Sequence, residues 1–108
     1  MSAKPIIWAG TSLEDIRAFP EDARRLAGQS LRLVREGLEP HDWKPMPSVG
    51  AGVTEFRIHT GVEHRVFYIA KFREAIYVLH AFQKRTRKTA KKDIELARRR
   101  YGQLIRDR

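Results

Sequence analysis

Two arginines and a lysine–arginine pair could form a site for phosphate. Arg57 and Arg65 occupy two stretches with the alternating pattern of β-strands, joined by a tight hairpin, so both side chains can project from one sheet face. Lys84 and Arg85 follow directly after a third expected strand. Guanidinium groups bind phosphate oxygens bidentately, and a lysine adds a point charge. These four residues therefore predict a phosphate clamp able to hold the scissile phosphate of RNA and offset its developing charge.

Glu55 is the acidic residue of the first of these strands and lies two positions before Arg57. A carboxylate there could act as general base on a ribose 2′-hydroxyl. The alternative is a structural role or an ion pair with a neighbouring arginine. Each arginine has the corresponding alternative, a cross-strand ion pair with Glu55 or Glu63.

The sequence gives little support for a metal site, a nucleotide-binding site or a serine hydrolase. The four histidines (41, 59, 64 and 80) lack metal-ligand spacing, and the chain has no cysteine, so we expect neither a metal nor another cofactor. No phosphate-binding Walker loop, dinucleotide fingerprint or G-x-S-x-G motif occurs. His80 lies in an apolar strand and is interpreted as a core histidine, whereas His59 and His64 flank the hairpin turn, within reach of substrate or simply solvated. Trp43 either stacks on a base or packs under its loop.

The net charge of +9 is concentrated near the C-terminus. Residues 84–108 hold eleven basic and three acidic side chains, and so carry +8 of the total. Such a block indicates a polyanion partner: RNA, DNA, an anionic membrane or an acidic protein. A solvated helix face is the alternative. If the partner is RNA, the predicted contacts are Lys44, Arg85, Arg87, Lys88 and Lys91.

The first half of the chain predicts a strand and a helical hairpin. Residues 4–9 form a short apolar run, and Ser12 has the place of an N-cap for a helix to about Ala18. A second helix follows Pro20, with apolar residues at helical spacing, and ends at Gly37. Residues 38–52 are rich in proline and glycine and predict a long loop.

The second half predicts three strands and a helix. The strands are expected at 53–59, 64–72 and 75–82, the last being apolar on both faces and therefore central. Thr89 could cap a basic helix from Ala90 onward. The order β-α-α-β-β-β-α predicts one α+β domain over residues 1–108, with the helical hairpin packed on a small antiparallel sheet. Without a signal peptide or a membrane-spanning run, we expect a cytoplasmic protein.

Four segments together resemble the RelE/HigB toxins of type II toxin–antitoxin systems, closest to the phage-derived, HigB-like branch. The segments are Lys44-Pro45 followed by Val53-x-Glu55-Phe56-Arg57; Arg65-Val66-x-Tyr68; Val78 to Phe82 leading into Lys84-Arg85-Thr86; and Ala97-x-Arg99. Each is weak alone, but their order and spacing make the set fairly specific. The resemblance implies a RelE-like fold.

The resemblance also implies an activity, metal-independent mRNA cleavage, often on the translating ribosome, that inhibits translation. The matching positions are Arg57, Arg65, Lys84 and Arg85. Some relatives use a Tyr or His near the start of the C-terminal segment, and residues 86–91 contain neither. The proton transfers are therefore left to Glu55, Lys84 or Lys91, or to ribosomal groups.

Two alternatives remain beside the nuclease. One is a ParE-like toxin that acts on DNA gyrase without cleaving RNA, and the other is a non-catalytic nucleic-acid-binding module. For either toxin, the expected partner is a helix-turn-helix antitoxin. We expect the free toxin to be a monomer and its complex with the antitoxin to be larger. No interaction with a membrane is expected.

Overall fold

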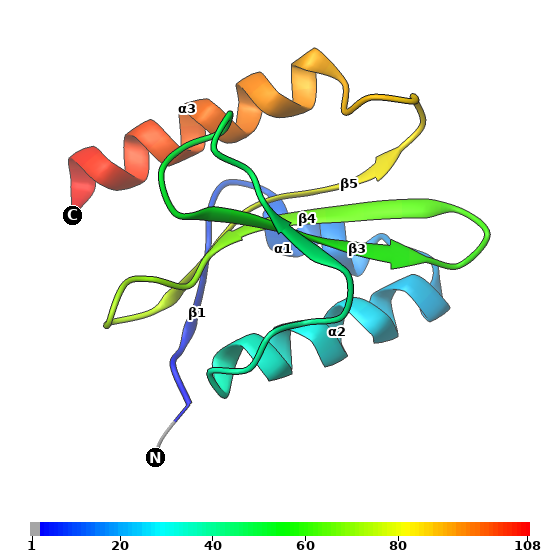
Figure 1. The fold of residues 1–108 in the computed structure, drawn as a ribbon, viewed down its shortest axis with the longest axis horizontal. Coiled ribbons are helices and arrows are strands. Elements are labelled where there is room, and N and C mark those ends of the chain that lie inside the picture. The colour runs from blue at the N-terminus through cyan, green and yellow to red at the C-terminus, as the bar shows by residue number, and fades with distance from the viewer. Residues whose placement is uncertain (1–2) are drawn as a thin grey trace.

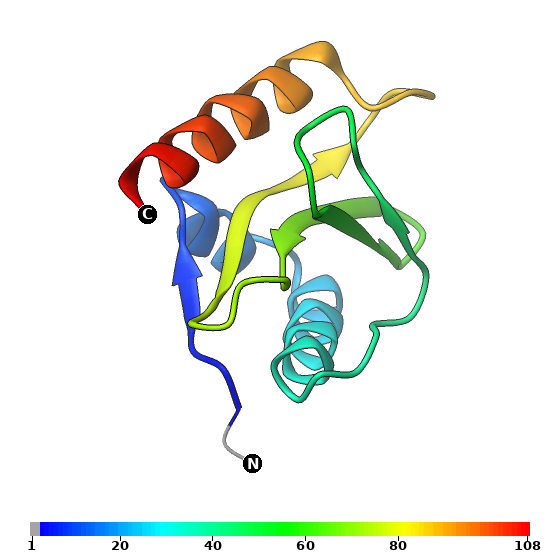
Figure 2. The same ribbon diagram turned by 60° about the vertical axis from the view of Figure 1, so that its left-hand side comes forward.

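The computed structural model describes residues 3–108, which form a mixed five-stranded sheet between two helical layers. In chain order, the elements are β1 (Ile6–Trp8), α1 (Ser12–Arg17), α2 (Glu21–Arg35), β2 (Trp43–Pro45), β3 (Val53–His59), β4 (Glu63–Ile69), β5 (Ile76–Lys84) and α3 (Lys91–Asp107). α1 and α2 lie on one side of the sheet and α3 crosses the other (Figures 1 and 2). The predicted α+β class is confirmed.

The strand order is β1-β5-β4-β3-β2, which places β5 inside the sheet as its two apolar faces predicted. β2, β3, β4 and β5 pair antiparallel, whereas β1 runs parallel to β5. The sheet is therefore mixed rather than wholly antiparallel. Residue alternation shows which face a side chain takes, but it carries no information on the direction of the neighbouring strand.

The predicted loop 38–52 contains the short edge strand β2, which the sequence did not suggest. Pro45 has no N–H to donate, and such a residue is tolerated in an edge strand. The pairing of β2 with β3 sets Lys44 opposite Glu55. The strand predicted at 64–72 also differs, because β4 begins at Glu63 and ends at Ile69.

One face of the sheet packs against α1 and α2. Phe56 and Ile58 from β3 and Val66 and Tyr68 from β4 enter a core with apolar residues of both helices. These strand residues alternate with Glu55, Arg57 and Arg65, which therefore project from the opposite face. The amphipathic pattern of β3 thus places its charged residues away from the helical hairpin.

The opposite face divides into an apolar part and a charged part. Val53, Phe67, Ile69 and Leu79 pack there with Ala97 and other residues of α3. Glu55, Arg57 and Arg65 continue the same face beyond this cluster. Within residues 3–108, no helix is both long enough and apolar enough to span a membrane.

Helix ends differ from the prediction by one residue or two. Thr11, not Ser12, occupies the N-cap of α1, while Ser12 is buried and its hydroxyl donates to the Val78 carbonyl at 3.2 Å. α3 begins at Lys91 after Ala90, so Thr89 does not cap it. Gly37 directly follows the C-cap of α2 with φ +81°, the left-handed conformation that makes glycine a good helix stop.

Candidate active site

Arg57 and Arg65 are direct partners in the register between β3 and β4. As predicted, both guanidinium groups belong to one face of the sheet. Two like charges directly opposite each other destabilise a strand pair unless anions lie between them. The structure supplies those anions from three different segments.

Glu55 is the innermost of these anions, with only 1% of its surface exposed. Its Oε1 lies 2.8 Å from Arg65 Nε and 3.5 Å from Arg57 Nε, so both arginines share one carboxylate oxygen. The other oxygen, Oε2, has no hydrogen-bond partner among residues 3–108. Glu55 thus has one oxygen ion-paired with both arginines and one buried oxygen without a hydrogen-bond partner.

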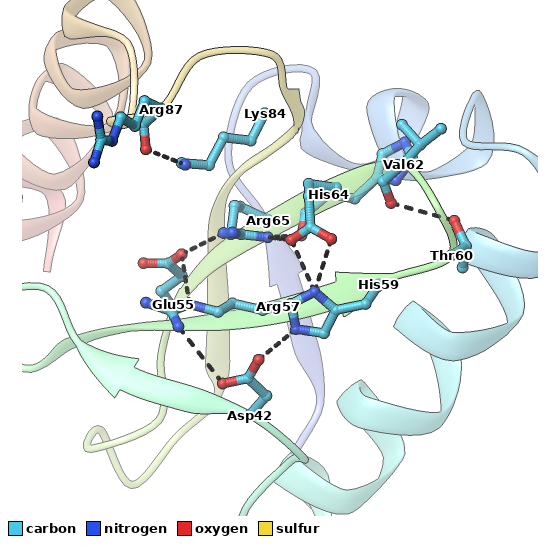
Figure 3. A network of polar contacts seen from close by, with 11 residues as sticks. Asp42, Glu55, Arg57, His59, Thr60, Val62, His64, Arg65, Lys84 and Arg87 are labelled. Carbon is cyan, nitrogen blue, oxygen red and sulfur yellow. Dashed lines mark hydrogen bonds and ion pairs between the residues drawn. The ribbon is translucent and has the colours of Figure 1, made fainter.

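Asp42 and Glu63 supply the outer anions. Asp42 Oδ1 lies 3.7 Å from Arg57 Nη1, and Glu63 Oε1 accepts a hydrogen bond from Arg65 Nη1 at 2.9 Å. His59 lies between the two acids: its Nε2 forms a hydrogen bond with Asp42 Oδ2, and its Nδ1 lies 2.8 Å from Glu63 Oε1 (Figure 3). These bonds raise the pKa of His59, with Asp42 the larger cause, and lower the pKa of each acid.

The two arginines differ in what they can offer a ligand. The Arg65 side chain is 8% exposed, its Nε and Nη1 face Glu55 and Glu63, and Nη1 also donates to the His64 carbonyl at 3.0 Å. Arg65 is therefore already ion-paired with two acids of the protein, and its predicted role in binding phosphate stays a prediction. The Arg57 side chain is 31% exposed and is the more accessible of the two.

A cleft of about 420 Å³ joins these charges to further basic residues. Lys44 reaches it from β2 and Lys84 from the end of β5, and Lys84 Nζ donates to the Arg87 carbonyl at 2.7 Å (Figure 3). Seven of the nine residues predicted for catalysis or RNA binding line this cleft: Lys44, Glu55, Arg57, Arg65, Lys84, Arg87 and Lys88.

Arg85 and Lys91 do not line the cleft. Arg85 donates to the Gln83 side chain at 3.0 Å and lines a neighbouring depression, while Lys91, 89% exposed, lies 3.8 Å from Glu95 in α3. Their predicted contact with RNA stays a prediction. Lys84 lines the same cleft as Glu55 and Lys91 does not, so Lys84 is the better-placed ammonium for proton transfer.

The other aromatic and histidine candidates have structural partners. His80 is buried and bonded to Asp93 of α3 at 2.8 Å, which confirms its interpretation as a core histidine. Burial lowers its pKa. Trp43 lies on β2, 38% exposed, and donates to Glu39 at 3.1 Å, without lining the cleft. Among residues 3–108, no three His, Asp or Glu side chains converge as metal ligands would.

A larger cavity of about 740 Å³ lies between α3 and β1, away from these residues. Its charged residues include Glu74 and Arg108, which form a bidentate pair at 2.8 and 3.0 Å and lower the pKa of Glu74 to about 2. Since that pair is mutually satisfied, the smaller basic cleft is the better candidate for chemistry.

Sequence reasoning missed the role of Asp42. No motif includes it, and only the β2–β3 pairing, in which the Arg57 N–H donates to the Asp42 carbonyl at 2.9 Å, brings it to Arg57. Its positive φ of 48° is uncommon outside glycine and tolerated by aspartate. Glu63 was predicted as a possible ion-pair partner of the arginines, and it pairs with Arg65, whereas the contact of His59 with Asp42 and Glu63 was not predicted.

The fold and the cleft define a class of small α+β protein in which a buried carboxylate and several cations line one cleft. The chain belongs to a family described as phage-derived protein Gp49-like (DUF891), which matches residues 14–102. This is a toxin-like family of the RelE/HigB type. No curated protein sequence matches the chain.

Proposed function

We propose that this protein is the toxin of a type II toxin–antitoxin system and cleaves mRNA, without a metal, on the translating ribosome. The observation that carries the proposal is the buried Glu55, which has one oxygen free and lies between two arginines in a cleft lined by lysines. A nuclease that uses the ribose 2′-hydroxyl needs a base beside cations that hold the phosphate. The membership in a toxin-like family supports the same function.

In this mechanism, Glu55 Oε2 accepts the proton of a ribose 2′-hydroxyl. The 2′-oxygen forms a bond to the adjacent phosphorus as the bond from phosphorus to the 5′-oxygen breaks. The products are a 2′,3′-cyclic phosphate and a 5′-hydroxyl. The negative charge that develops on the phosphate is offset by Arg57, by Lys84 and by the part of the Arg65 guanidinium that faces neither Glu55 nor Glu63. Lys84 is the proposed donor of the proton to the leaving 5′-oxygen.

Cleavage in a purified translation system tests this function. We expect discrete cuts in mRNA with the wild type, and a rate lower by about 10²–10⁴-fold for Glu55→Gln, the size typical of a positioned general base. Arg32→Ala removes an exposed arginine from α2, on the other side of the sheet, and should cleave like the wild type. The same reactions without ribosomes show whether free RNA suffices.

Two results would contradict the nuclease. Equal cleavage by wild type and Glu55→Gln would remove Glu55 from the chemistry. Intact mRNA with folded wild-type protein would argue against cleavage altogether. DNA gyrase supercoiling would then be measured, because inhibition there would support the ParE-like alternative.

The proposed partner in the resting cell is a helix-turn-helix antitoxin, with the complex in the cytoplasm. The concentration of +8 of charge in residues 84–108 suggests that acidic residues of the antitoxin contact this region. The affinity for the protein encoded by the neighbouring gene should therefore fall as ionic strength rises. An affinity unchanged between low and high salt would contradict an electrostatic interface.

A further inference from the structure

Six side chains form a closed ring in which acidic and basic groups alternate. In order around the ring they are Asp42, Arg57, Glu55, Arg65, Glu63 and His59. They come from the segment before β2, from β3 and from the beginning of β4 (Figure 3). The function proposed above uses the inner half of this ring and assigns nothing to Asp42, His59 and Glu63.

His59 can complete the ring only as a cation. Both of its ring nitrogens face carboxylates, Nε2 toward Asp42 and Nδ1 toward Glu63. A neutral imidazole has one N–H, whereas the imidazolium has two, and an ionised carboxylate can only accept. Both bonds are therefore satisfied together only when His59 is protonated.

The outer acids reach the arginines and His59 at the same time. Glu63 Oε1 accepts from Arg65 Nη1 and from His59, and Asp42 touches Arg57 with one oxygen and His59 with the other. While His59 is charged, each acid is shared between two cations. After His59 loses its proton, Asp42 and Glu63 retain only the arginines as counter-ions and compete with phosphate for them.

We propose that Asp42, His59 and Glu63 are positioning residues, which hold Arg57 and Arg65 ready for a substrate phosphate only while His59 carries its proton. This inference rests on the proposed function, because it concerns the same RNA phosphate. The groups that face His59 are Asp42 from the segment before β2 and Glu63 from β4, with Arg57 and Arg65 behind them. The ring is complete between the lowered pKa values of the acids and the raised pKa of His59.

The first test compares KM and kcat for RNA cleavage across pH 5.5–9 in wild type, His59→Gln and His41→Gln. We expect the wild-type KM to rise about fivefold through the pKa of His59, since exposed ion pairs contribute up to about 1 kcal/mol. His59→Gln should show the raised KM at every pH, with kcat nearly unchanged. His41 is exposed and adjacent to Asp42 but outside the ring, so His41→Gln should behave like the wild type. A pH dependence of KM shared by wild type and His59→Gln would overturn the inference.

A second test needs no variant. The pKa of His59 is measured by NMR with and without a 2′-O-methyl oligonucleotide, which lacks the attacking hydroxyl. If phosphate draws the arginines away from Asp42 and Glu63, those acids depend more on His59, and linkage requires its pKa to rise on binding. Binding with an unchanged pKa would overturn the inference alone. Wild type that neither binds the oligonucleotide nor cleaves RNA would overturn the proposed function, and this inference with it.

Discussion

Glu55 and Arg65 should be energetically coupled, and the strength of this coupling follows from their burial. The Glu55 side chain is 2% exposed and that of Arg65 is 8% exposed, with 2.8 Å between Oε1 and Nε. Removing one member of a buried ion pair costs about 3–5 kcal/mol, because the other charge stays buried without its partner. In Glu55→Gln, Arg65 still has the half-exposed Glu63, so we expect the lower end, about 3 kcal/mol.

Arg65→Met leaves Glu55 with Arg57 at 3.5 Å and should also cost about 3 kcal/mol. The double variant removes both charges, and uncharged side chains often replace a buried ion pair at little cost. We expect it to be destabilised by about 3 kcal/mol, against about 6 kcal/mol for the sum of the two single losses, which makes the coupling about 3 kcal/mol. Each single loss is a large part of the 5–15 kcal/mol typical of a domain, so the measurements belong at low temperature.

Urea unfolding followed by tryptophan fluorescence measures the four free energies of this cycle. The exposed pair Lys91 and Glu95, at 3.8 Å, provides a matched control. Its cycle, with Lys91→Met and Glu95→Gln, should give a coupling below about 0.5 kcal/mol. If the Glu55 and Arg65 losses simply add, the carboxylate is not compensated by Arg65 and the geometry of the site is wrong.

Two further predictions concern salt and pH. The accessible cations of the cleft are Lys44, Arg57, Lys84, Arg87 and Lys88. If each contacts one phosphate, a plot of log affinity for single-stranded RNA against log salt concentration should have a slope of about −3.5. Lys88→Ala should make this slope shallower by about 0.7, and fluorescence anisotropy measures both. Burial lowers the pKa values of His64 and His80, so the unfolded chain binds protons that the folded chain does not, and the free energy of unfolding should fall as pH drops below 6.5. His80→Gln should weaken this dependence in urea unfolding between pH 8 and 5, and an unchanged slope would contradict the role of His80.

Local patterns predicted the parts of the fold that local interactions determine. Alternation along 53–59 separated Phe56 and Ile58 from Glu55 and Arg57, and the structure puts the two sets on opposite faces. A tight hairpin joined the strands, so the pairing of Arg57 with Arg65 was already within reach of the sequence. The long helix between Pro20 and Gly37 was equally clear from its period and its ends.

The part of the site that the sequence did not predict depends on the pairing of β2 with β3. β2 contains Pro45 and only three residues, so nothing in its composition separates it from the surrounding loop. Its pairing with β3 nevertheless brings Asp42 to Arg57 and Lys44 opposite Glu55. One of the six members of the charged ring, Asp42, depends on this edge strand and therefore could not be placed from residue spacing.

The ion pairs around the buried Glu55 separate two roles of the cleft, attraction of RNA and catalysis, which the basic composition alone does not distinguish. At the floor of the cleft, Arg57 and Arg65 are matched by Glu55, Asp42 and Glu63, so the net attraction for RNA there is small. Lys44, Arg87 and Lys88, which we call the rim, line the same cleft and form no ion pair within residues 3–108, and they supply the long-range attraction. A rim variant should therefore change affinity and its salt dependence, whereas a Glu55 variant should change the rate of cleavage at saturating RNA. If Lys88→Ala lowered kcat as strongly as Glu55→Gln, this division between rim and floor would be wrong.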